Sequence, residues 1–241
     1  MDNRLLRLRS VLPEDPSAGA WRETRGWNIH LNTGDKRLIK VYGLISVVGI
    51  VQFLFLTFVA ACFYPGGYDY FGYYFSDLGA VTARNGEPNT LSSTLFSISL
   101  PGVALSLIPF WIGVRALSGE SKLGRVLSKI GSVSGLFSTP FILGVVLYPM
   151  DTHLNAHILT TMLFFTFFMI GMVSYSAMFI ASGEHPSSHG FIGLLLFSLS
   201  IPIFLDHSAS YVAFLQKVLA YGCFIWVLLP LRLLYKSNAY G

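Results

Sequence analysis

Long apolar runs separated by short polar segments are the main pattern along this chain. Six runs approach or exceed the roughly 20 apolar residues that a membrane-spanning helix needs. They cover residues 41–64, 94–114, 130–148, 156–182, 190–205 and 211–235. The fifth run is short and contains Pro202, and the sixth admits Lys217 near its start, so these two could instead form a re-entrant pair. Because Leu, Ile and Phe dominate both runs, we expect six crossings and an all-α, polytopic six-helix bundle.

The composition supports a membrane protein. Of 241 residues, 53% are hydrophobic and 12% charged, and the mean hydropathy is +0.60. These values are too apolar for an ordinary soluble domain. The net charge of +4 comes mainly from basic residues that flank the apolar runs, so it is no argument for nucleic-acid binding. We therefore expect membrane lipid, and no nucleic acid, as a partner.

The basic residues predict the orientation of the bundle. With six crossings, all but two of the 16 basic residues fall in the N-terminal segment, the second-to-third connection and the C-terminal tail. Short cytoplasmic connections retain Lys and Arg, which predicts that both termini are cytoplasmic. The first 40 residues lack the apolar core of a signal peptide, so the first span would act as an uncleaved anchor. The expected division is a cytoplasmic extension (1–40), a membrane domain (41–236) and a cytoplasmic tail (237–241).

The first connection on the opposite side, residues 65–93, is rich in Tyr and Phe. Such rings suit the headgroup layer of a membrane, where the ring is buried and the hydroxyl stays wet. Ser76 and Asp77 lie between Phe75 and Leu78, and Gly79 then permits a tight turn. Ser76 and Asp77 are therefore candidate catalytic residues, with the cap of a short interfacial helix as the alternative.

The third-to-fourth connection brings two histidines close together. If a helix begins by Thr152, His153 and His157 are one turn apart on one face, a spacing that lets two imidazoles bind one metal ion. Asp151 could be a third ligand, could orient a histidine, or could cap the helix. Hydrogen-bonded histidines at the interface are the alternative to a metal site.

Asp206 and His207, in the fifth-to-sixth connection, belong to the same side of the membrane. Ionisable groups beside lipid usually face a protein interior and pair with one another. His153, His157, His207 and Asp206 are thus candidate ligands of zinc, which would lower the pKa of a bound water. Asp77 or Asp151 could act as general base, and Lys217 could hold a lipid phosphate or an oxyanion. A polar network that only braces the helices is the alternative.

Short motifs in this chain resemble those of a six-span family. Residues 73–80, Tyr-Tyr-Phe-Ser-Asp-Leu-Gly-Ala, followed by Asn89, look like the signature of an uncharacterised family of prokaryotic membrane proteins. That family is distantly similar to the DRAM and GPI-lipid-remodelling membrane proteins. Residues 144–151 with His157 resemble its third-to-fourth junction. The resemblance covers residues 41–235 and implies a six-helix bundle with the Ser-Asp-Leu-Gly loop outside, but no established activity.

A second similarity is to the alkaline ceramidase superfamily, seven-span hydrolases that combine a Ser, an Asp and three His around zinc. Ser76 and Asp77, with the three histidines above, supply the same residue types. The order of the motifs and the number of spans differ. Two functions therefore stay open: a metal-dependent lipid hydrolase or remodelling enzyme, and a non-catalytic transporter or scaffold with a polar outer cavity.

Overall fold

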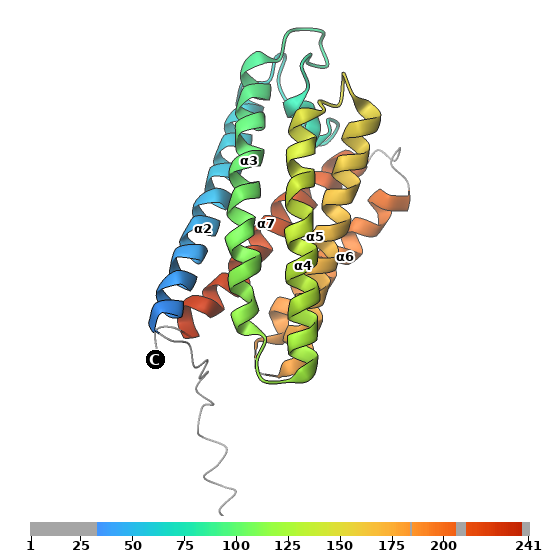
Figure 1. Cartoon of the computed structure of the whole chain (residues 1–241). Coiled ribbons are helices and arrows are strands. Elements are labelled where there is room, and N and C mark those ends of the chain that lie inside the picture. Colours follow the sequence, from blue (N-terminus) through green and yellow to red (C-terminus); the bar gives the residue numbers. More distant parts are fainter. Residues whose placement is uncertain (1–32, 184, 206–210, 238–241) are drawn as a thin grey trace, which may run out of the picture.

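The computed structural model describes residues 33–183, 185–205 and 211–237, and these residues form a helical bundle (Figure 1). Six long helices are accompanied by two short 3₁₀ helices in this part of the chain. Their bounds are α2 Thr33–Cys62, η1 Phe75–Gly79, α3 Thr90–Gly113, η2 Val114–Leu117, α4 Lys122–Leu147, α5 Leu154–Ser182, α6 Ser187–Leu205 and α7 Val212–Ser237.

The six predicted spans are confirmed, because each long helix is long and apolar enough to cross a membrane. The protein is thus a multi-pass membrane protein. Separate, antiparallel α6 and α7 favour two crossings over a re-entrant pair (Figure 1). The largest differences from the predicted runs are the starts of α2 and α4, at Thr33 and Lys122, each eight residues before the apolar run. Ser121 caps the start of α4, its Oγ accepting a hydrogen bond of 2.8 Å from the Gly124 N–H.

The helices form a closed ring. Each helix packs against its neighbours in sequence, and α7 packs against both α6 and α2. Apart from the long connection 63–89, the connections between consecutive helices are short, which favours this antiparallel arrangement. In Figure 1, α7 crosses behind the other helices and ends beside the start of α2. The closed ring lets one end of the bundle carry several connections side by side.

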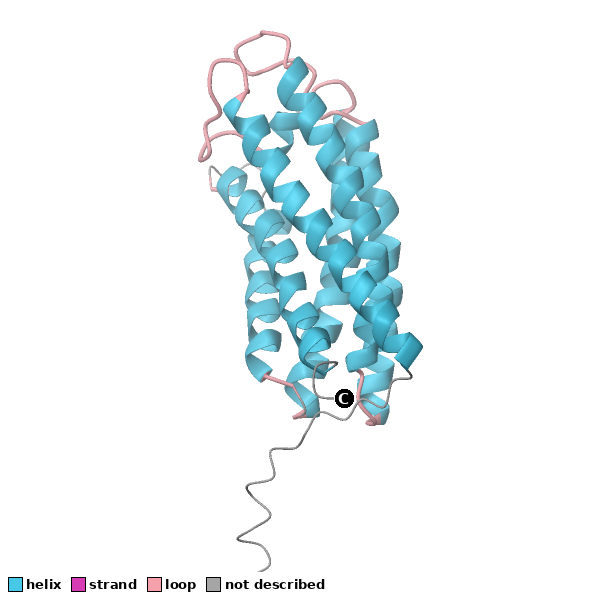
Figure 2. Cartoon of the chain, turned by 90° about the vertical axis from the view of Figure 1, so that its left-hand side faces the viewer, coloured by secondary structure: helices cyan, strands magenta, loops and turns pink. Residues whose placement is uncertain are grey.

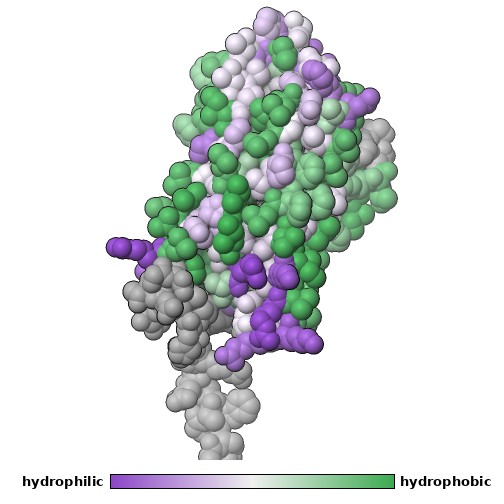
Figure 3. Space-filling view, in the orientation of Figure 1, coloured by the Kyte–Doolittle hydropathy of each residue, from purple (hydrophilic) through white to green (hydrophobic). Residues whose placement is uncertain are grey.

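Large apolar side chains cover the outer surface of the helices, as expected where lipid is the solvent. On α2, for example, Val48, Phe55 and Phe58 are more than half exposed. Figure 3 shows apolar side chains along the length of the bundle, with hydrophilic ones gathered mainly toward its ends. The pattern identifies the middle of the bundle as the membrane-embedded part.

The two ends of the bundle differ. At one end lie the long connection 63–89 and the connection 148–153, which form the upper loops of Figure 2. We call this the loop end. At the other end, α2 begins and α7 finishes, and the Tyr235 hydroxyl donates to the Lys40 carbonyl over 3.0 Å. The α3–α4 and α5–α6 connections also lie there (Figure 1).

Candidate functional site

The connection 63–89 folds over the loop end around the short helix η1. Phe75, Ser76, Asp77 and Leu78 are all buried. The Asp77 carboxylate accepts a hydrogen bond of 2.7 Å from the Tyr74 N–H, which caps the start of η1. One contact of Asp77 is therefore the helix cap that the sequence offered as the alternative to catalysis.

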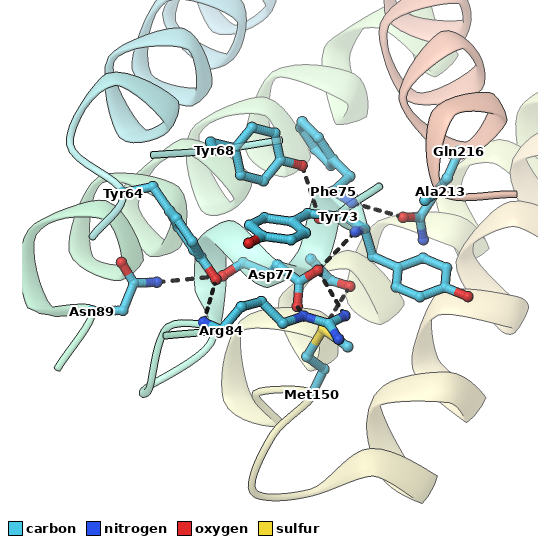
Figure 4. A network of polar contacts seen from close by, with 12 residues as sticks. Tyr64, Tyr68, Tyr73, Phe75, Asp77, Arg84, Asn89, Met150, Ala213 and Gln216 are labelled. Atoms are coloured by element: carbon cyan, nitrogen blue, oxygen red, sulfur yellow. Dashed lines mark hydrogen bonds and ion pairs between the residues drawn. The ribbon is translucent and has the colours of Figure 1, made fainter. Parts of the chain in front are cut away.

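Arg84 supplies the other contacts of Asp77. Its Nε and Nη2 each donate to one carboxylate oxygen over 3.0 Å, a bidentate ion pair (Figure 4). Asp77 is only 3% exposed, whereas the Arg84 side chain is 45% exposed. The hydrogen bonds that Arg84 donates to Asp77 raise the pKa of the Arg84 guanidinium. The pairing was not predicted from the sequence, although Arg84 is the one basic residue of its connection.

The side chain of Asn89 fixes η1 in place. Its side-chain amide donates to the carbonyl oxygens of Asp77, Leu78 and Ala80 at 3.3, 3.2 and 2.9 Å. Asn89 is fully buried, and its Oδ1 has no hydrogen-bond partner among the described residues. An Asn just before a helix suggests an N-cap, but here the side chain instead fixes the preceding loop.

Asp151 joins the two loops. Its carboxylate accepts hydrogen bonds from the Val81 and Thr82 N–H groups, at 3.1 and 2.9 Å. Because α5 begins only at Leu154, His153 is the N-cap residue of α5, with φ −136° and ψ 50°. His153 and His157 would share a helical face only if the helix began by Thr152, and it does not. The exposed His153 ring instead contacts Thr152, with Nδ1 3.0 Å from Oγ1.

The first turns of α7 are attached to the same loop. The buried Lys217 ammonium donates to the Tyr73 carbonyl, and also to the Ala213 carbonyl over 2.9 Å. The Gln216 Oε1 accepts a hydrogen bond of 2.9 Å from the Phe75 N–H (Figure 4). Gln216 was not among the predicted residues. A second polar side chain beside Lys217 in an apolar helix was the available signal.

A cavity of about 240 Å³ lies beneath η1, between α5, α6 and α7. Most of its wall is apolar, and its polar side chains come from η1, α5, α6 and α7. The lining includes Ser76, His157, Thr161, Ser200, Phe204 and Gln216. A smaller cavity of about 50 Å³ adjoins it and shares Ser76, His157, Thr161 and Gln216. Of the predicted site residues that the structure describes, only Ser76 and His157 line these cavities.

The hydrogen bond of His157 fixes the tautomer of its ring. Nδ1 lies 2.8 Å from the Tyr148 carbonyl oxygen, and a carbonyl can only accept, so Nδ1 carries the proton in the neutral ring. Nε2 is then an acceptor, available to a ligand or a metal. Ser76 also has one contact, its Oγ donating to the Met150 Sδ over 3.2 Å.

Asp206 and His207 lie outside the described residues. Among those that are described, no group of three His, Cys, Asp or Glu side chains could hold a metal ion. The zinc site thus stays a prediction, because two of its expected ligands belong to the segment 206–210.

Comparison of the chain with protein families, with curated proteins and with solved structures finds no match. The resemblance to the six-span family therefore rests on the quoted motifs alone.

Proposed function

We propose that this multi-pass membrane protein binds a membrane lipid in the cavity beneath η1 and has no catalytic role, acting as a lipid carrier or scaffold. The observation that carries this proposal is the cavity itself. It is enclosed mainly by apolar side chains, while Ser76, His157 and Gln216 bring polar groups to the side nearest η1. Binding sites for small molecules commonly combine an apolar wall with a few placed polar groups.

The contacts of the candidate catalytic residues favour binding over catalysis. Asp77 is paired with Arg84 and with backbone, Asp151 with two backbone N–H groups, and Lys217 with two carbonyls. These hydrogen bonds occupy the groups that a general base or an oxyanion-binding cation would need. They hold the loop 63–89 over the cavity, a positioning role.

The proposal includes an orientation. Arg37, Lys40, Arg115, Lys122 and Arg232 belong to helix ends or connections opposite the loop end. The positive-inside rule then makes that side cytoplasmic, together with the extension 1–40 and the tail 237–241. The loop end and its cavity would face the outside. A cysteine introduced at Phe71 should react with an impermeant maleimide added to intact cells, in a Cys62→Ser background, and a C-terminal cysteine should not.

Lipid binding is tested with the full chain in nanodiscs. The probes are a phospholipid and a neutral lipid that each carry a photoactivatable acyl chain. Wild type should bind at least one of them saturably. Thr161→Phe, which places a ring at a position that lines both cavities, should weaken that binding by tenfold or more. Leu159→Phe is the matched control, because Leu159 is on the same helix and 59% exposed. Saturable binding that Thr161→Phe leaves unchanged would refute the proposed site.

Metal-dependent lipid hydrolysis is the second candidate, and the His157 ring favours it. Its Nε2 is an acceptor in a residue that lines the cavity. With Asp206 and His207 as further ligands, the set would suit zinc, which activates water for attack on an ester or amide. Zinc analysis of the purified chain decides between the candidates. Stoichiometric zinc that is lost in both His157→Ala and His207→Ala favours hydrolysis, and metal-free, folded wild type removes it.

A further inference from the structure

A third cavity, apolar and of about 460 Å³, lies between α5 and α6 in the membrane-embedded part of the bundle. We call it the α5–α6 groove. On α5 it is lined by residues from Thr166 to Ser174, directly after the residues that line the cavity beneath η1. At 1.5 Å per residue, the α5 portion of the groove extends roughly 12 Å toward the middle of the bundle.

The groove and the cavity adjoin at two residues of α6. Ser200 and Phe204 line both of them. Ser200 is buried, and its hydroxyl donates to the Phe197 carbonyl over 2.6 Å, so at this position the boundary between the two spaces is a small side chain whose hydroxyl is already hydrogen-bonded. Phe204 and Ile201 are each more than 40% exposed. The groove therefore opens toward the bilayer, where it is surrounded by lipid acyl chains.

The polar end of this combined space offers hydrogen bonds but no charge. Among the described residues, the lining of the cavity and the groove includes no Asp, Glu, Lys or Arg. The nearby cations Arg84 and Lys217 are already hydrogen-bonded to Asp77 and to carbonyls, outside the lining. An ionised phosphate placed here would meet no counter-charge from these residues, at a high desolvation cost.

The available hydrogen-bonding groups define a complementary ligand. His157 Nε2 accepts a hydrogen bond, which suits a ligand hydroxyl. The Gln216 Oε1 accepts a hydrogen bond from the Phe75 N–H. The group of this amide that can donate to a ligand carbonyl is therefore its NH₂ group. The Thr161 Oγ1 is buried without a partner among the described residues. An ester or amide carbonyl near a hydroxyl would satisfy all three.

We infer that the bound lipid is an uncharged single-chain lipid with a hydroxyl and an ester or amide carbonyl, of the monoacylglycerol type. Its polar end lies beneath η1 at His157, Thr161 and Gln216, and its acyl chain runs along the α5–α6 groove. This inference rests on the proposed lipid binding and adds the class of lipid and its pose. The lipid reaches the site sideways from the bilayer, through the exposed side of the groove.

The test uses the full chain in nanodiscs and a monoacylglycerol with a diazirine at the end of its acyl chain. Light should attach the probe to groove residues such as Met169, Ile170 and Phe197. Unlabelled monoacylglycerol should compete at least tenfold better than lysophosphatidic acid of the same chain length. Ser200→Phe, which blocks the junction, should reduce labelling by tenfold or more.

Ser198→Phe is the matched control. Ser198 is two residues away on α6, is exposed, and makes the same kind of hydrogen bond, to the Leu195 carbonyl over 2.7 Å. The Ser198→Phe variant should be labelled as strongly as wild type. Ile170→Trp narrows the groove from the α5 side and should reduce labelling. It keeps the pose testable if gel filtration shows that Ser200→Phe does not fold.

The outcomes separate the two proposals. Saturable binding with the chain end attached outside the groove would overturn the pose and leave lipid binding intact. Equal competition by the phosphate lipid would overturn the uncharged class. Absence of saturable binding by any lipid would overturn the proposed function and this inference together.

Discussion

The two sides of α5 pack in different ways. On the close side, Phe168 and Tyr175 are completely buried and lie against Trp111 of α3. On the open side, six residues from Leu154 to Phe165 line the cavity beneath η1, and residues from Thr166 to Ser174 line the α5–α6 groove. Both sides are largely apolar, so the difference comes from their neighbours. Small residues on α4 let large rings fit closely around the close side, whereas the side chains of α6 and α7 leave space beside the open side.

The close side of α5 is organised around Trp111. Its ring lies against Gly135 and Gly171. The Ser132 hydroxyl contacts the Trp111 carbonyl at 2.5 Å and the Tyr175 hydroxyl at 2.6 Å. Helices in membranes pack through such small residues and interhelical hydrogen bonds. The contrast shows that one apolar helix can be tightly packed on one side and line a cavity on another, depending on which side chains of the neighbouring helices it meets.

Gly135→Leu should have the largest effect, because it disrupts the packing on the close side of α5. A Cβ at this position would collide with the fully buried Trp111 ring. We expect a loss of more than about 3 kcal/mol of stability, measured by thermal unfolding in detergent. Val133→Leu, on the exposed side of the same helix, is the control and should unfold like wild type. Equal unfolding of the two variants would contradict the packing argument.

Asn89→Asp should have the next largest effect and should act on the loop end. The new carboxylate could not donate to the three carbonyl oxygens that Asn89 now binds. We expect a loss of about 2 to 3 kcal/mol and faster hydrogen exchange in residues 75–81. Asn85→Asp, in the exposed part of the same loop, should leave exchange in 75–81 unchanged. Slow exchange in Asn89→Asp would show that the amide does not hold η1.

Asp77→Asn should weaken the loop less. It keeps an acceptor for the Tyr74 N–H but loses the charge that pairs with Arg84. Because Arg84 is half exposed and can be hydrated, we expect a loss of only about 1 to 2 kcal/mol. The loop should become more sensitive to limited proteolysis at 63–89, while Asp69→Asn, at an exposed carboxylate, should not. A loss of much more than this would mean that Asp77 has contacts besides those described above.

Thr161→Val should have the smallest effect and should separate stability from binding. It removes a buried hydroxyl that lacks a partner among the described residues, which should stabilise the protein by about 1 kcal/mol. The same change should weaken lipid binding. Thr139→Val also removes such a hydroxyl, but Thr139 lines none of the three cavities described above. The Thr139→Val variant should be more stable than wild type and should bind lipid as wild type does. Equal binding by both variants would remove Thr161 from the site.

The sequence alone determined the six helices and their order, because runs of about 20 apolar residues have few other stable forms in lipid. It also pointed to Ser76 and His157, through polar residues beside apolar runs. It did not show that Asp77 pairs with Arg84, that Asp151 binds the backbone of a distant loop, or that Lys217 bonds to carbonyls. Those contacts depend on how separate connections meet at one end.

Only the tertiary structure decided where the cavity lies and which residues line it. Thr161, Ser200 and Gln216 come from three helices and have no common motif, so no spacing in the chain connects them. Their arrangement follows from side-chain packing between α5, α6 and α7, which is set by the fit of specific shapes. Hydropathy measures how readily a residue enters the membrane, and that is why it predicted the spans but not the space between them.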